Sequence, residues 1–114
     1  MQMNIRTLNL DASPSLDDHA FERVMTALSH FAERVGAVDV RLEDVHGQRH
    51  GQDMRCTLRV HIEGAGVVMI EQVEADIYDA IDAAAHRLKR VVHRKVGRSR
   101  GFAHERHSDQ RRAA

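Results

Sequence analysis

Two segments of the chain alternate between apolar and polar residues, and this pattern limits the possible folds more than any other feature. Residues 37–45 (AVDVRLEDV) and residues 54–63 (MRCTLRVHIE) each carry an apolar residue at every second position. Side chains of a β-strand point alternately to opposite faces, so each segment has one apolar face that needs a covering layer. The polar, glycine-containing segment between them, HGQRHGQD, favours an antiparallel hairpin.

Two segments with helical periodicity can supply that layer. The first is expected to begin at an N-cap Ser15, to continue to about Val35 and to end at Gly36. Its apolar stripe consists of Phe21, Val24, Leu28, Phe31 and Val35. The second is expected to begin near residues 75–76 and to end at Gly97. Its apolar stripe consists of Ile77, Ile81, Ala84, Leu88, Val91 and Val92.

Two further strands complete the pattern, at residues 3–10 and 67–73, the latter after the turn Gly64-Ala65-Gly66. The face of residues 67–73 that points inward is left open, because four successive residues there are apolar. The expected order is β-α-β-β-β-α. Each helix has a single apolar face, so we predict an α+β fold with two helices packed on one face of a four-stranded sheet. Residues 1–100 form this domain, and residues 101–114 are expected to be a polar, disordered tail.

The length of 114 residues suits one domain with a hydrophobic core. The single cysteine, Cys56, excludes an intramolecular disulfide and fits a reducing cytoplasm. The first residues lack the pattern of a signal peptide, and no apolar run approaches the roughly 20 residues that span a bilayer. A cytoplasmic protein without membrane contact is expected.

Charge is divided unevenly along the chain although the formal net charge is zero. Residues 1–82 contain seven arginines and fifteen acidic residues, whereas residues 83–114 contain ten basic and only two acidic residues. This asymmetry favours a polyanionic partner for the C-terminal part.

The basic residues of the second helix have two interpretations. Arg87, Arg90 and Arg94 follow i, i+3, i+7 spacing and form a stripe, which His86 and His93 extend; Lys89 is expected to point elsewhere. The stripe can bind an RNA or DNA backbone, or it can be a solvated helix end that complements the helix dipole. Only three phenylalanines and one tyrosine are present, so recognition would rely on shape and phosphates rather than on base stacking.

Catalytic and metal-binding patterns are missing from the sequence. The nine histidines lack HExxH spacing and no second cysteine supports a zinc site, so scattered surface histidines are the better interpretation. Cys56 is expected in the core, because alternation places His61 on the opposite face of the strand. The acidic residues around position 76 suit a helix start. No catalytic triad or phosphate-binding loop is found, and neither enzymatic activity nor a cofactor is expected.

The chain resembles the short ribosome hibernation-promoting factor and ribosome-associated inhibitor A family, over about residues 3–98. Tyr78, Ala80, Ile81 and Asp82 are similar to the family's Y-x-A-I-D opening of the second helix. Residues 87–90 (RLKR) stand where the family has K-L-x-R. The opening strand, the strand pair and the Gly-Ala-Gly turn also fit. The departures are a valine at position 91 in place of glutamine, arginine at most lysine positions, and a more acidic first helix.

This resemblance implies a fold like that of a double-stranded-RNA-binding domain. It also implies a translation inhibitor that binds the 16S rRNA of the small ribosomal subunit and occludes the mRNA and tRNA sites. It implies no cofactor, no small-molecule substrate, no catalysis and a monomer off the ribosome. The residues expected to contact rRNA are Arg87, Lys89, Arg90, Arg94, Lys95 and Arg98.

Two other functions remain open from the residues. One is a protein-interaction module that binds a regulatory partner through the sheet face or an edge strand. The other is a general RNA-binding domain that is not tied to the ribosome.

Overall fold

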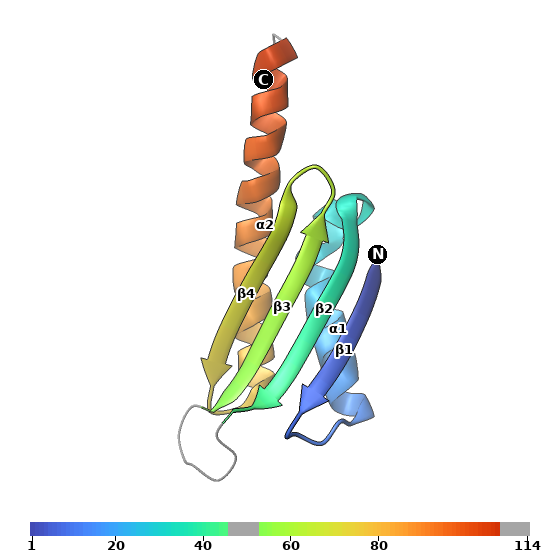
Figure 1. Cartoon of the computed structure of the whole chain (residues 1–114), viewed down its shortest axis with the longest axis vertical. Helices are drawn as coiled ribbons and strands as arrows, with labels where there is room; N and C mark the ends of the chain where they lie inside the picture. Colours follow the sequence, from blue (N-terminus) through green and yellow to red (C-terminus); the bar gives the residue numbers. More distant parts are fainter. Residues whose placement is uncertain (46–52, 108–114) are drawn as a thin grey trace.

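The computed structural model describes residues 1–45 and 53–107, and for residues 98–107 it describes the backbone alone. The elements along the chain are β1 (Gln2–Leu8), α1 (Pro14–Leu28), the 3₁₀ helix η1 (Ser29–Arg34), β2 (Val35–Asp44), β3 (Met54–Ile62), β4 (Gly66–Glu74) and α2 (Ile77–His107). Apart from η1, this is the predicted order β-α-β-β-β-α (Figure 1).

The four strands form one sheet in the order β1-β2-β3-β4. β1 lies parallel to β2, as the crossover through α1 requires, and the other neighbours are antiparallel. The predicted hairpin is confirmed: Val40 pairs with Leu58, and Leu58 pairs with Ile70 on the other side. The segment 46–52, expected to be a loop, lies outside the described residues.

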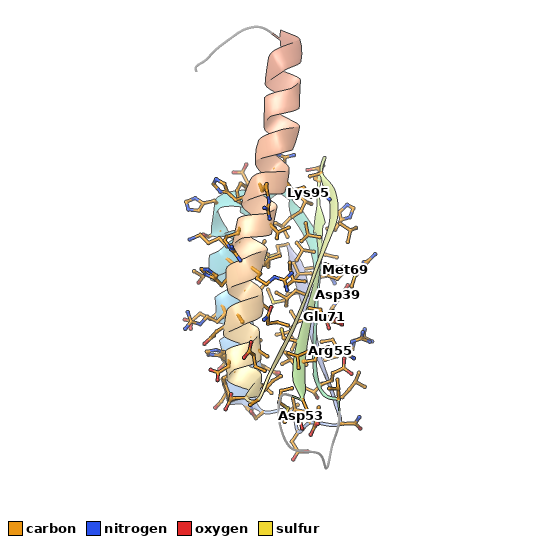
Figure 2. The ribbon with its side chains drawn as sticks, turned by 90° about the vertical axis from the view of Figure 1, so that its left-hand side faces the viewer. Asp39, Asp53, Arg55, Met69, Glu71 and Lys95 are labelled. Carbon is orange, nitrogen blue, oxygen red and sulfur yellow. The ribbon has the colours of Figure 1, made fainter. Side chains whose placement is uncertain are left out.

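Both helices cover the same face of this sheet, which confirms the predicted α+β architecture (Figures 1 and 2). α2 packs on β3 and β4, and α1 packs against α2. The predicted inward residues of β2 and β3 are all buried, and they are Val38, Val40, Leu42, Cys56, Leu58, Val60 and Ile62. On β4 the register resolves the open question, since Val68 and Ile70 are buried whereas Val67 and Met69 are exposed.

The first helix differs from its prediction at both ends. Its N-cap is Ser13, whose Oγ accepts the Leu16 N–H at 3.1 Å, and Pro14 occupies the first turn. The α-helix ends at Leu28 and tightens into η1, because Phe31 departs from helical backbone angles. Gly36, expected to end the helix, lies within β2.

Phe21 also departs from its prediction, because its side chain is 50% exposed. The other four residues of the predicted stripe are buried, and the inward face of α1 is completed by the buried side chains of Leu16, Ala20 and Ala27.

The second helix is longer than predicted. It begins at Ile77, where the carboxylate of Asp76 accepts the Tyr78 N–H at 2.7 Å, and it continues through Gly97 to His107. A Cβ placed at Gly97 would meet nothing within 4 Å, so this glycine occupies an ordinary helical position rather than a terminus. The predicted helix end at Gly97 is therefore wrong, whereas the predicted domain boundary after residue 100 stays a prediction. Residues 108–114 of the expected tail lie outside the described part of the chain.

The face of the sheet opposite the helices is open and carries charged cross-strand neighbours. Arg55 of β3 lies between Glu43 of β2 and Glu71 of β4, with N–O distances of 3.1 and 3.5 Å. Met69 is 61% exposed on the same face, as Figure 2 shows beside Arg55 and Glu71.

Candidate nucleic-acid interface

The outward face of α2 carries five side chains that can be positively charged and that line one open hollow of about 700 Å³. We call them the basic cluster, and they are His86, Lys89, Arg90, His93 and Arg94. Their spacing of i, i+3, i+4, i+7, i+8 places them on one side of a helix over about two turns. The opposite side of the same turns is anchored in the core by Leu88 and Val92. Packing of the apolar face therefore fixes the direction of the basic one.

Lys89 belongs to the basic cluster although it was expected to point elsewhere, and Arg87 lies apart from it. The guanidinium of Arg87 turns to the free side of β4, where Nη1 donates to the Glu71 carbonyl at 2.9 Å and to Gln72 Oε1 at 3.0 Å. An unpaired strand edge offers such carbonyl groups, and Arg87 is close enough to satisfy one of them. Helical spacing alone did not reveal this competing acceptor.

The last two expected contact residues do not join the basic cluster in the described part of the structure. Lys95 is half-buried, and a Cβ on Gly66 would lie 4.0 Å from its Cε and Nζ, so its side chain lies against the turn between β3 and β4 (Figure 2). The side chain of Arg98 lies outside the described residues, although its backbone continues α2.

His86 and His93 complete the basic cluster, and the predicted contact set did not include them. His93 packs edge-on against Phe31 of η1, with ring centroids 5.7 Å apart. Its imidazole is therefore positioned by a contact with the other helical segment. The signal was present in the sequence, because the two histidines are seven residues apart and flank Arg90 at four and three residues.

A groove of about 200 Å³ between α1 and α2 borders the basic cluster and shares His86 and Lys89 with it. Arg23 of α1 contributes a further positive charge there, but Asp82 lies 3.0 Å from its Nε. The same Asp82 oxygen is 2.7 Å from Nε2 of His19, so one carboxylate links the two helices. This link fixes the position of Arg23 and offsets part of its charge.

Other kinds of chemistry find no support in the described residues. They contain no group of three or more His, Cys, Asp or Glu side chains that could hold a metal ion. Cys56 is fully buried, and desolvation raises the pKa of its thiol to about 12, which removes its nucleophilic form near neutral pH. None of the described helices has both the length and the apolar character needed to cross a membrane.

The family model of the sigma 54 modulation protein / S30EA ribosomal protein matches residues 3–100. The chain belongs to this family. The match contains α1, β2, β3, β4 and the whole basic cluster, and all of β1 except Gln2. It confirms the resemblance that the second helix indicated. No curated protein matches this member of the family by sequence.

Two solved structures share the fold of this family member. The N-terminal domain of Thermus thermophilus Protein Y is 26% identical in sequence, with a TM-score of 0.69 over 82% of this chain and 98% of that domain. A ribosomal subunit interface protein from Coxiella burnetii is 12% identical, with a TM-score of 0.68 over 85% of this chain and 99% of that one. At this lower identity the second comparison supports the fold alone.

Proposed function

We propose that this protein is a ribosome-associated hibernation factor that inhibits translation by binding the 16S rRNA of the small ribosomal subunit. The observation that carries the proposal is the basic cluster, which stands on the outward face of a helix in a chain of the S30EA family. The protein acts by occupancy, and its own residues perform no chemical step.

Lys89, Arg90 and Arg94 are the residues that we assign to phosphate contacts. None of the three has an ion-pair partner among the described residues, so no internal carboxylate must be displaced when RNA binds. Arginine can hold a phosphate through two parallel hydrogen bonds, and lysine adds a mobile point charge. The hollow that these side chains share allows one stretch of backbone to contact several of them.

Arg87 and Lys95 have supporting roles in this proposal. Arg87 would keep α2 aligned with β4 through the carbonyl of Glu71, and Lys95 would shield the turn between β3 and β4. A rigid cluster binds an extended RNA backbone at a lower entropic cost than a mobile one. Bound in this way, the domain would exclude mRNA and tRNA sterically, and it would act as a monomer.

The direct test is the double variant Arg90→Glu with Arg94→Glu, assayed by co-sedimentation with purified small subunits. We expect affinity to fall by more than about tenfold, because two attractive phosphate contacts become repulsive. The matched control is Arg6→Glu with Arg59→Glu, which changes the net charge equally on the open sheet face, where both arginines are exposed. If the control variant loses binding and the α2 variant keeps it, the sheet face rather than the basic cluster is the contact.

Salt dependence provides a second, independent test. With about three phosphates neutralised, the logarithm of the binding constant should fall against the logarithm of salt concentration with a slope of about −2 to −3. Treatment of the complex with RNase should release the protein. A flat salt response together with retention after RNase would identify a protein partner instead.

A further inference from the structure

The outer side of α1 carries a second hollow of about 720 Å³, which shares no lining residue with the hollow of the basic cluster. Its lining includes Asp18, Phe21, Glu22 and Met25, which form an apolar pair and an acidic pair at i, i+4 spacing. Phe21 exposes half of its side chain, whereas Val24 is buried. An exposed phenylalanine ring and a methionine side chain offer apolar contact area of the kind that is enriched at protein interfaces.

The charge of this hollow is opposite to that of the basic cluster. The carboxylates of Asp18 and Glu22 have no ion-pair partner in the described chain, and the imidazole of His19 in the same lining is held by Asp82. Two uncompensated carboxylates repel an RNA phosphate. The helical layer therefore carries unpaired basic side chains on α2 and unpaired acidic side chains on the outer side of α1.

We infer that the α1 hollow binds a cationic protein segment, rich in lysine or arginine, while α2 lies on RNA. The chemistry of the hollow fits such a segment at each position. An arginine guanidinium stacks on the ring of Phe21, its aliphatic stem packs on Met25, and the carboxylates of Asp18 and Glu22 accept its N–H groups. This inference rests on the proposed function, since it assigns a second partner within the same complex.

The direction in which a charge reversal changes the affinity for ribosomes distinguishes a cationic protein segment from RNA as the partner of the hollow. In the double variant Asp18→Lys with Glu22→Lys, affinity for ribosomes should fall by about tenfold if the hollow meets a cationic segment. Affinity should rise if the hollow meets RNA phosphates, and that result would overturn the inference, as would no change. The matched control is Asp11→Lys with Glu63→Lys, two exposed carboxylates outside the hollow, which adds the same charge. The milder pair Asp18→Asn with Glu22→Gln should change affinity in the same direction and guards against loss of folding.

A photoreactive benzoylphenylalanine at position 21 of the full chain identifies the partner directly. After irradiation of the ribosome complex, we expect an adduct that resists RNase and that maps by mass spectrometry to a lysine- or arginine-rich protein segment. Adducts to RNA alone, or none from bound protein, would overturn the inference. If unmodified protein does not bind ribosomes at all, the proposed function fails instead, so the two failures are distinguishable.

Discussion

Cys56 is the third residue of β3 and lies on the face that both helices cover, and no part of its side chain reaches solvent. Burial disfavours the thiolate, and it raises the pKa of the thiol from 9.0 to about 12. The unfolded chain therefore loses this proton at lower pH than the folded protein does. Between these two values the unfolded state binds fewer protons, so stability falls as pH rises.

A variant without the thiol should lose this part of the pH dependence. From about pH 9 upward, the free energy of unfolding of the wild type should fall by about 1.4 kcal/mol per pH unit more steeply than that of Cys56→Ala. The measurement is urea unfolding at a series of pH values, with the difference in slope between the two proteins as the readout. Equal slopes would show that the folded thiol ionises as readily as the unfolded one.

Individual side chains of α2 show how much of the interface could be predicted. Helical spacing correctly placed Arg90 and Arg94 together on the outward face, because the buried residues fix the rotation of the helix. It misplaced Arg87 and Lys89 because each stands near the border between helix faces, where a neighbour decides the direction. For Arg87 that neighbour is the carbonyl of Glu71, which is sixteen residues away in the chain.

At the scale of single elements, two glycines show how a position inside a helix differs from a position in a turn. Gly97 lies inside α2 with free space where a Cβ would stand, whereas Gly66 opens β4 with a φ of +91°. Of these two glycines, only Gly66 needs a backbone conformation that L side chains rarely adopt.

The two positions should therefore respond in opposite directions to alanine. Gly97→Ala should stabilise the protein by up to about 1 kcal/mol, since alanine is the better helix former. Gly66→Ala should destabilise it by about 1 kcal/mol or more, because of the left-handed backbone. Thermal and urea unfolding followed by circular dichroism measure both effects. Destabilisation by Gly97→Ala would show that α2 does not pass through this position as a regular helix.

The boundaries of the elements were harder to predict than their existence. Alternation predicted β2 and β3 with their inward faces because a period of two survives small shifts of the ends. The end of α1 was placed seven residues too late, because Phe31 continues the apolar periodicity although its backbone has left the α-helix. Phe31 belongs to the hydrophobic core, and its ring also packs edge-on against that of His93 of α2.

For the whole molecule, the sheet and the helical layer end well before α2 does (Figure 1). α2 contains 31 residues, and its last buried side chain in the described region is that of Val96. The helix beyond Gly97 projects past the body. Packing against the core therefore does not determine where α2 ends.

A chain shortened to residues 1–97 should keep the fold but bind ribosomes less well. We expect its thermal midpoint to stay within a few degrees of that of the full chain, since the removed residues follow the last described core side chain. Affinity for ribosomes should fall, and the salt slope should become shallower, because residues 98–114 contain five arginines. A large loss of stability would mean that the removed segment packs on the body.

The fold class was predictable from the sequence because both helices and the two central strands each have one apolar face, and few arrangements bury all of these faces together. The acidic hollow on α1 was not predictable, because Phe21 fits the apolar stripe in sequence and only packing shows that Leu16 and Ala20 occupy the inward face instead. Where two candidate faces overlap on a helix, the partner element decides between them.

α2 follows all four strands in the chain, and this order has a consequence for biosynthesis. α2 covers β3 and β4, so these two strands keep their apolar face uncovered until α2 has left the ribosome. The basic cluster stands on this same helix. Completion of the core over β3 and β4 and display of the basic cluster are thus a single event.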